Sequence, residues 1–191
     1  GNDGDRHHLV RSTGLGPMTD PLKIAVAGVG TVGAGTLRLL RENADIVAAR
    51  GGRPIVVTAV SARDRTRDRG IGLDGIQWFD DAVDLAKNAD ADVVVELIGG
   101  AGGVAKQVCE IAIAERRHVV TANKALIAHH GTALAIAAEA AGVSLGFEAA
   151  VAGGIPIIKS IREGLAANKF KRVYGILNGT CNYILTDMRL T

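Results

Sequence analysis

Apolar and polar positions alternate along the chain with two different periods from Lys23 to Phe147. Short runs of small or β-branched apolar residues are typical of buried strands, and segments with one apolar side are typical of helices. The pattern predicts strands at 24–27, 54–62, 77–79, 91–97, 118–121 and 144–147, and helices at 31–42, 82–87, 104–116 and 132–141. Because strands and helices follow one another through short turns, these elements should form βαβ units in a parallel sheet. Right-handed crossovers then place helices on both faces of the sheet.

The pattern changes after Phe147, in the segment EAAVAGGIPIIKSIREGL. Two glycines and Pro156 indicate a new helix that starts near Ile155 and ends near Gly164, because proline is tolerated at the first helical position. A further strand is predicted at 170–177 and a further helix at 180–189. This strand would lack neighbours, and an exposed strand edge pairs readily with another chain, so self-association is expected.

Composition excludes several classes of protein. The chain has 191 residues, a net charge of +2, 48% hydrophobic and 22% charged residues, which predicts an ordinary domain with a substantial core. No basic stripe is interleaved with aromatic residues, so a nucleic-acid partner is not expected. The apolar runs are too short to span a bilayer, and the first residues lack the apolar core of a signal peptide. Two cysteines, Cys109 and Cys181, form no disulfide framework, which favours the cytoplasm.

The segment Gly28-Val29-Gly30-Thr31-Val32-Gly33 fits the pattern G-x-G-x-x-G between a predicted strand and a predicted helix. In that context Gly28 permits a tight turn, Gly30 lets the backbone approach a diphosphate, and Gly33 lets the helix pack closely on the strand. The first N–H groups of the helix would then face the phosphates. The alternative is a glycine-rich helix start that binds no ligand.

The fold class that follows is α/β, a Rossmann-type doubly wound parallel sheet with the beginning of a second, α+β substrate domain. Residues 1–17 are expected to be a tag or disordered. Residues 18–150 are the predicted dinucleotide-binding domain. Residues 151–191 are predicted to hold a hinge helix and the truncated start of the substrate and dimerisation domain.

The end of the second predicted strand should face the ribose of the nucleotide. The sequence there is Ser61-Ala62-Arg63-Asp64-Arg65, and Arg63 arrives where a 2′-phosphate would lie. Arginine binds phosphate through a planar fork of donors, so NADP is favoured. Asp64 could instead hold the ribose of NAD if the strand ended one residue later. The other alternative is a solvated loop of arginines, because charge runs usually have that role.

Three further loops follow predicted strands, at 97–100, 121–126 and 148–156, and ligands gather at such strand ends. Lys124 could bind a cofactor or substrate group, or move a proton. An ordinary lysine at a helix start is the alternative, although cations are disfavoured there. Glu148 could bind a metal together with nearby carbonyls, or could act as a capping or hinge carboxylate. The three histidines of the predicted domain are expected to be structural or at the surface: His118, His129 and His130.

Six segments, in order, resemble the homoserine dehydrogenase family. They are GVGTVG, SARD, VVVELIGG, VTANKALIA, EAAVAGGIPIIKSIREGL and YGILNGTCNYIL, and the likeness runs from about Lys23 to the last residue. The resemblance implies NAD(P)-dependent interconversion of L-homoserine and L-aspartate 4-semialdehyde, in threonine and methionine biosynthesis. It also implies a homodimer or a higher oligomer in the parent protein.

The resemblance also implies roles for individual residues. Val29, Thr31 and Val32 match the turn that contacts the dinucleotide, and Arg63 matches a position near the adenosine ribose. Lys124 matches a lysine near the nicotinamide and the substrate. In the family this lysine is a proposed proton-relay or binding group. The nicotinamide is expected over the strand ends near Ile98–Gly100, and Ile98, Gly99 and Thr121 are candidate cofactor-binding residues.

Two more sets of residues carry implied roles. A monovalent cation, sodium, is expected at Glu148, Val151, Gly153 and Ile155, where it would stiffen the joint between domains. The start of the substrate pocket is expected at Gly179 and Thr180.

The sequence departs from the family at its end. Family members continue with an acid-rich segment that carries substrate carboxylates and a lysine thought to supply the proton, so this chain is expected to be an inactive fragment. Two rival functions stay open. An acyl reaction like that of aspartate-semialdehyde dehydrogenase needs a cysteine nucleophile with a histidine base, and Cys181 has no obvious partner. A dinucleotide-binding sensor without catalysis is the other.

Overall fold

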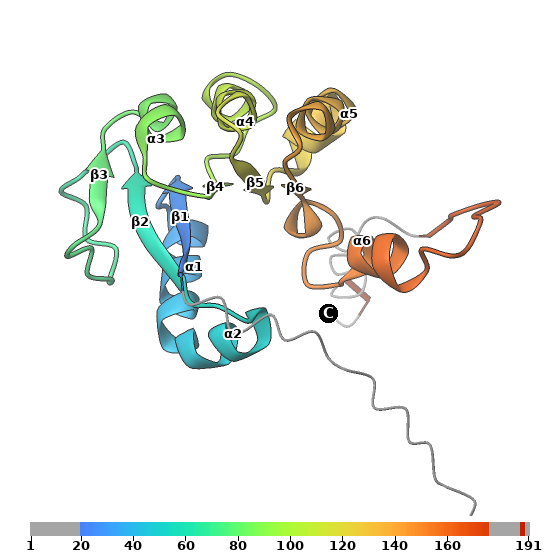
Figure 1. Ribbon diagram of the computed structural model, residues 1–191, viewed down its shortest axis with the longest axis horizontal. Helices are drawn as coiled ribbons and strands as arrows, with labels where there is room; N and C mark the ends of the chain where they lie inside the picture. The colour runs from blue at the N-terminus through green and yellow to red at the C-terminus, as the bar shows by residue number, and fades with distance from the viewer. Residues whose placement is uncertain (1–19, 176–187, 190–191) are drawn as a thin grey trace, which may run out of the picture.

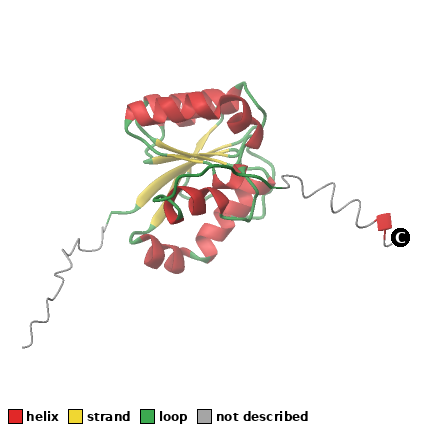
Figure 2. Cartoon of the chain, turned by 90° about the vertical axis from the view of Figure 1, so that its right-hand side faces the viewer, coloured by secondary structure: helices red, strands yellow, loops and turns green. Residues whose placement is uncertain are grey.

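The computed structural model describes residues 20–175 and 188–189, and in them one parallel sheet lies between two layers of helices (Figures 1 and 2). The strand order is β3-β2-β1-β4-β5-β6, and every neighbouring pair is parallel. The strands are β1 Leu22–Ala27, β2 Ile55–Ser61, β3 Gln77–Phe79, β4 Val93–Glu96, β5 His118–Thr121 and β6 Leu145–Gly146. The predicted α/β doubly wound fold is confirmed.

The helices are α1 Thr31–Glu42, α2 Ala44–Gly51, α3 Ala82–Asn88, α4 Val104–Ala114, α5 Lys124–Ala141 and α6 Ile157–Lys159, with a 3₁₀ turn η1 Glu148–Ala150 and a π turn η2 Ser160–Gly164. Helices α3, α4 and α5 cover one face of the sheet, and α1 and α2 cover the other (Figure 1). This placement on both faces is the one that right-handed crossovers produce.

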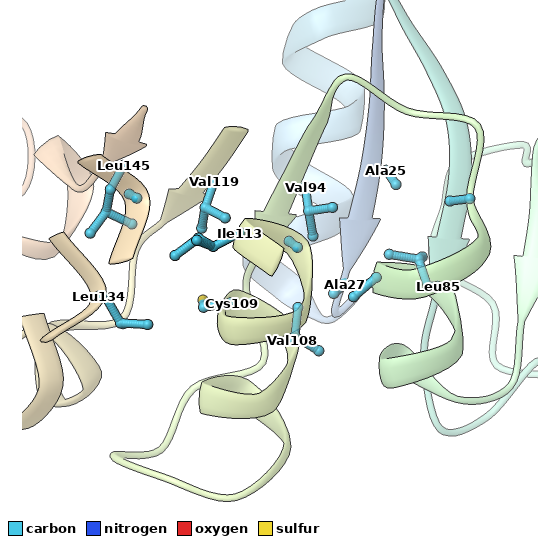
Figure 3. Packing of buried hydrophobic residues seen from close by; sticks show 14 of the residues in the cluster. Ala25, Ala27, Leu85, Val94, Val108, Cys109, Ile113, Val119, Leu134 and Leu145 are labelled. Atoms are coloured by element: carbon cyan, nitrogen blue, oxygen red, sulfur yellow. The ribbon is translucent and has the colours of Figure 1, made fainter. Parts of the chain in front are cut away.

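Two apolar cores lie on the two faces of the sheet. Ala25 and Ala27 of β1 point into the larger core, with Leu85, Val108 and Leu126 from the helices above (Figure 3). The intervening residues of β1 point the other way, into a core formed with α1. Because successive side chains of a strand face opposite sides, a run of small apolar residues serves both cores.

The larger core contains Cys109, which lies on α4 and is fully buried. Burial raises the pKa of its thiol to about 12, with smaller contributions from the negative charges of Glu96 and Glu110. A neutral, inaccessible thiol is a poor nucleophile.

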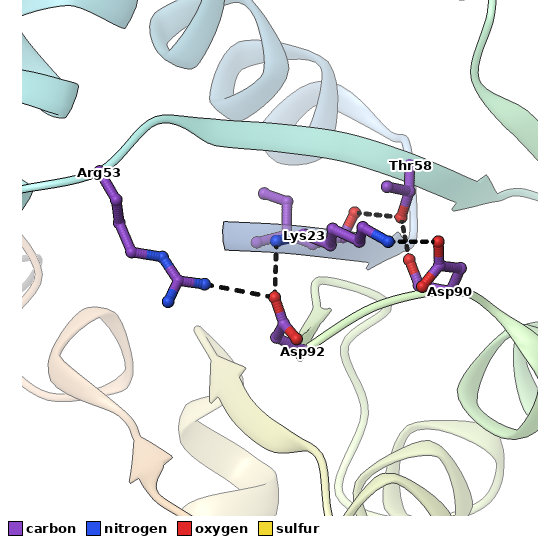
Figure 4. Close-up of polar contacts among 6 residues, drawn as sticks. Lys23, Arg53, Thr58, Asp90 and Asp92 are labelled. Carbon is purple, nitrogen blue, oxygen red and sulfur yellow. Dashed lines mark hydrogen bonds and ion pairs between the residues drawn. The ribbon is translucent and has the colours of Figure 1, made fainter. Parts of the chain in front are cut away.

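At the amino-terminal ends of the strands, ion pairs and a hydrogen bond join the starts of β1 and β2 to the segment before β4. The backbone N–H of Lys23 donates to Asp92 at 2.9 Å, and its ammonium contacts Asp90 at 2.7 Å (Figure 4). The hydrogen bond to Asp90 and that residue's charge raise the pKa of Lys23. Arg53 reaches Asp92 from the start of β2, with 3.4 Å between nitrogen and oxygen. These exposed pairs fix strand ends more than they add stability.

Three helical predictions need correction. Helix α2 was not predicted, because none of its residues is buried and no apolar stripe indicates it. Helix α5 begins at Lys124 and not at residue 132, since Asn123 caps it and Leu126 packs into the core. The predicted helix near Ile155 starts at Ile157, with Pro156 as its N-cap, and ends as a π turn at Gly164.

The predicted strand at 170–177 is not formed by residues 170–175, to which the structure assigns no strand. In the described part of the chain no strand pairs with this segment, and its expected association with another chain stays a prediction. Residues 176–177, the predicted tag at 1–17 and most of the predicted helix at 180–189 lie outside the described residues; only 188–189 are described there, and they are helical. Within 20–175 and 188–189, no helix has the length and apolarity that a membrane span requires.

Close packing of α1 on the end of β1 depends on Gly33. A Cβ at this position would lie 2.1 Å from the carbonyl oxygen of Gly28, which is shorter than any tolerated contact. Gly35 in the same helix is a natural control, because a Cβ there would meet no atom within 4 Å.

We expect Gly33→Ala to lower the free energy of unfolding by about 2–3 kcal/mol, because the turn or the helix must move aside. Gly35→Ala should raise it by about 0.5–1 kcal/mol through better helix propensity. Thermal unfolding followed by circular dichroism measures both changes. Equal melting temperatures for the two variants would contradict the packing described.

Candidate functional site

A pocket of about 460 Å³ opens at the carboxyl ends of the strands, where β1 and β4 lie side by side. The chain leaves β1 towards β2 on one side and reaches β4 and β5 on the other, so this is the point where the strand order reverses. Ligands of doubly wound sheets bind at such a crevice. The pocket is lined by Gly28, Val29, Gly30, Ser61, Ala62, Arg63, Asp64, Arg67, Arg69, Asp80, Asp81, Ala82, Leu97, Ile98 and Val104.

The glycine turn between β1 and α1 forms one wall of this pocket. Gly28 has φ +102°, and a Cβ there would lie 2.7 Å from the carbonyl carbon of Leu97. A side chain is therefore excluded by both the backbone conformation and the approach of β4. Gly30 differs, since a Cβ there would meet no atom within 4 Å, and the backbone is open on the pocket side.

Helix α1 starts at this turn with its N–H groups uncapped. Gly30 is the N-cap, no side chain bonds the first turn within the described residues, and the first turn has no acidic residue. The first amides and the positive end of the helix dipole then point to the pocket. Thr31, Val32 and Gly33 lie in this first turn rather than among the lining residues. Such a helix start suits a phosphate or another anion.

The loop after β2 forms the opposite wall, and its arginines have different roles. Arg69 donates from Nε to the carbonyl of Val29 at 2.9 Å, and from its other nitrogens to the carbonyls of Asp64 and Arg67. Its guanidinium also lies 5.3 Å from the ring centre of Trp78. Arg69 thus joins the loop to the glycine turn, which the interpretation as a solvated run of charges did not foresee.

Arg63 and Asp64 lie at the ribose end that the sequence predicted. Arg63 is exposed and lines the pocket. Asp64 also lines it, but its Oδ1 accepts from the amide and the hydroxyl of Thr66, at 2.8 and 2.7 Å. These hydrogen bonds lower the pKa of Asp64 and keep it ionised. One of the two carboxylate oxygens is therefore already used inside the loop.

Glu96 is the feature of the site that sequence reasoning missed. It is fully buried at the end of β4, and its Oε1 accepts from the amides of Ile98 at 2.7 Å and Gly99 at 3.0 Å. Its Oε2 accepts from the hydroxyl of Thr121 at 2.6 Å. The signal was present in the sequence, because a carboxylate ends the otherwise apolar strand VVVE.

Thr121 and Asn123 extend these contacts to the next strand and helix. The amide of Asn123 donates to the hydroxyl oxygen of Thr121 at 3.0 Å. The Asn123 side chain accepts from the amide of Leu126 at 3.1 Å, which caps α5, and donates to the carbonyl of Gly100 at 2.7 Å. The loop after β4 and the start of α5 are therefore bonded to each other.

Lys124 is the first residue of α5, exposed and next to this set of bonds. It is not among the residues that line the pocket, and neither are Gly99 and Thr121. Its backbone is placed by the Asn123 cap, so the lysine side chain starts from a fixed point near the loop 97–100.

The histidines have the structural or surface places expected of them. The Nδ1 of His118 accepts from the amide of Ser144 at 2.9 Å, which joins the starts of β5 and β6. His129 and His130 lie on α5, away from the pocket.

Glu148 caps helix α6. Its Oε1 accepts from the amide of Ile158 at 3.0 Å, and its Oε2 accepts from that of Lys159 at 2.8 Å. The described residues contain no cluster of three or more His, Cys, Asp or Glu side chains that could hold a metal. The predicted cation partners Val151, Gly153 and Ile155 lie in the turn between Glu148 and α6. Gly179 and Thr180 lie outside the described residues.

Comparison with known proteins identifies the family. Residues 28–148 match the family model described as the NAD binding domain of homoserine dehydrogenase, and residues 156–191 match the model described as homoserine dehydrogenase. The chain belongs to the homoserine dehydrogenase family.

Curated relatives and a solved structure agree with this assignment. Homoserine dehydrogenase of Pseudomonas aeruginosa is 49% identical over 169 residues, which are 88% of this chain and 38% of the relative. That of Neisseria gonorrhoeae is 46% identical with the same coverage. The crystal structure of a homoserine dehydrogenase from Thiobacillus denitrificans superposes with a TM-score of 0.82 at 44% identity, over 91% of this chain and 40% of that one. The chain thus spans about 38% of the length of these curated relatives.

The buried thiol of Cys109 leads to a prediction about reactivity. We expect Cys109 in the variant Cys181→Ser to react with Ellman's reagent at pH 8 at least about 1,000-fold more slowly than a free thiol, since a raised pKa leaves little thiolate. The same variant in denaturant serves as the fully reactive control. Native and denatured rates that agree would show that Cys109 is accessible and would contradict its burial in the core.

Proposed function

We propose that this chain is the nucleotide-binding part of a homoserine dehydrogenase, and that the whole protein interconverts L-homoserine and L-aspartate 4-semialdehyde. The observation that carries the proposal is the uncapped start of α1 behind a glycine turn that packs on the end of β4. It lies within the residues that match the NAD binding domain of that family. Activity is proposed for the whole protein, because the chain spans about 38% of its relatives.

The lining of the pocket favours one orientation of a bound dinucleotide. The diphosphate would lie at the amides of residues 30–33, where no Cβ of Gly30 blocks it. The adenosine half would lie towards Arg63, and the nicotinamide half towards Ile98 and Gly99 at the end of β4. When bound, the nicotinamide supplies or accepts the hydride. The protein's part is to hold the two halves at opposite ends of the crevice.

NADP is the cofactor that we propose in preference to NAD. Arg63 lines the ribose end with its fork of donors, and Arg67 belongs to the same lining. Asp64, the residue that would favour NAD, already directs one oxygen to Thr66. A 2′-phosphate would meet one or two arginines there, which suits its charge.

Lys124 is the residue of this chain that we assign to the reacting groups. Reduction of the aldehyde leaves an alkoxide that needs a proton, and a positioned ammonium can donate it or hold the oxygen. Its place at the start of α5, beside the loop 97–100, supports this role. Gly179 and Thr180 are proposed to begin the substrate pocket. The cytoplasmic location and the homodimer implied by the resemblance remain predictions.

A monovalent cation is proposed at the turn that follows β6. Each oxygen of Glu148 accepts one amide, which leaves a lone pair on each for a cation. Among the hydrogen bonds between described residues, none uses the carbonyls of Val151 and Gly153, whereas that of Ile155 accepts from Ile157. Carboxylate and carbonyl oxygens are the donors that hard cations prefer. Sodium bound there would join the sheet to α6.

The nucleotide assignment is tested by fluorescence titration of this chain with NADPH and NADH. We expect Arg63→Ala to lower the affinity for NADPH by about tenfold or more and to change the affinity for NADH little, because only NADPH carries the 2′-phosphate. Arg65→Ala is the matched control, since Arg65 belongs to the same loop but lies over Trp78 and not in the pocket lining. Unchanged NADPH affinity in Arg63→Ala would overturn the assignment of Arg63.

The cation site is tested by thermal unfolding in sodium chloride and in choline chloride at equal ionic strength. Sodium at ten times its dissociation constant should stabilise the native chain by about 1.4 kcal/mol, a shift of a few degrees. We expect Glu148→Gln to abolish this sodium-dependent shift, and Glu163→Gln, an exposed change in the next turn, to keep it. A sodium response that survives in Glu148→Gln would place the cation elsewhere.

A further inference from the structure

The carboxylate of Glu96 is expensive to bury and is nevertheless fully buried. An ionised group loses its hydration inside a protein unless donors replace the water. The neighbouring residues of β4 are apolar, and the apolar core against α4 is formed by other residues. The carboxylate therefore has a use other than packing, and its contacts show which part of the chain it serves.

The bonds of Glu96 form a closed ring. From its carboxylate the ring passes through the amides of Ile98 and Gly99 to Gly100, from the Gly100 carbonyl to Asn123, and from Asn123 through Thr121 back to Glu96. The ring joins the end of β4, the end of β5 and the first residues of α5.

The carboxylate fixes the direction of the bonds made by Glu96 and Thr121. An ionised glutamate only accepts, so the amides of Ile98 and Gly99 and the hydroxyl of Thr121 must all donate to it. With its proton used in this way, the Thr121 oxygen is left to accept the amide of Asn123. Hydrogen bonds to a charged acceptor are stronger than neutral ones and hold their donors more closely.

The loop that Glu96 holds is packed only in its first half, where Leu97 and Ile98 contact the two cores, and its glycine half has little packing of its own. A Cβ at Gly99 or at Gly100 would meet no atom within 4 Å, and both glycines have positive φ, at +85° and +90°. Free glycines leave such a loop many conformations. The ring selects one of them, and Ile98 in that loop lines the pocket.

We propose that Glu96 is a positioning residue, which fixes the loop at the nicotinamide end of the pocket and, through Thr121 and Asn123, sets the start of α5 and Lys124 relative to it. This inference rests on the proposed function. Glu96 is not among the residues that line the pocket. Glu96 holds the loop by accepting from the backbone amides of Ile98 and Gly99. The adenosine end of the pocket, around Arg63, is held separately by the contacts of Arg69.

The separation of the two ends supplies a test that a merely structural role would not pass. The chain is titrated with NADPH and with 2′,5′-ADP, which carries the adenosine half and its phosphates but no nicotinamide. We expect Glu96→Gln and Thr121→Val to lower the affinity for NADPH by about tenfold and to leave the affinity for 2′,5′-ADP within about twofold of the native value. Thr121→Ser keeps the hydroxyl and should retain NADPH affinity within about threefold.

The outcomes separate the inference from the function on which it rests. Equal weakening of both ligands by the variants, or no weakening of either, overturns the role of Glu96 while the native chain still binds NADPH. A native chain that binds neither probe overturns the proposed function itself. Circular dichroism and melting temperature check that each variant is folded, and Thr121→Val decides the matter if Glu96→Gln does not fold.

Discussion

The approach of the β1–α1 turn to the end of β4 is the contact on which the site depends. Gly28 lies so close to the next strand end that a Cβ would come within 2.7 Å of the Leu97 carbonyl and 2.9 Å of the Ile98 nitrogen, and Gly33 lies against Gly28 from the other side. The turn and the first turn of α1 are thereby stacked on the loop after β4, about seventy residues away in the sequence, without side chains between them. The stack leaves the start of α1 open towards the crevice, where its amides attract an anion.

Two different devices fix the two walls of the crevice. At the ribose end, Arg69 donates hydrogen bonds to three carbonyls and lies over Trp78. These contacts fix the conformation of a loop of mixed charges, in which Arg63 lines the pocket. At the opposite end, the buried carboxylate of Glu96 accepts hydrogen bonds from two backbone amides and one hydroxyl. In both, one charged side chain satisfies several backbone groups, which is an efficient way to hold a loop that has no apolar core.

The segment after β6 joins this domain to the residues that match the second family model. Glu148 links the end of the sheet to α6 by accepting the amides of Ile158 and Lys159. Carboxylates at helix starts are stabilising, since they satisfy free amides and oppose the dipole. The cap and the proposed cation are compatible, because the carboxylate has lone pairs for both. A change of direction in the chain is thus held by polar contacts around Glu148.

The sequence by itself determined the order of strands and helices, the parallel sheet and the position of the glycine turn, because these depend on local periodicity and on residues such as Gly28 that few alternatives can replace. It also brought forward Arg63 and Glu148, which follow strands. Only the tertiary structure decided that Arg69 and not Arg63 holds the loop, that α5 begins eight residues early at its Asn123 cap, and that residues 170–175 form no strand. It alone joined Glu96 to Thr121 and Asn123, because hydrogen bonds between neighbouring strand ends depend on which strands become neighbours, and residue spacing along one chain does not encode that.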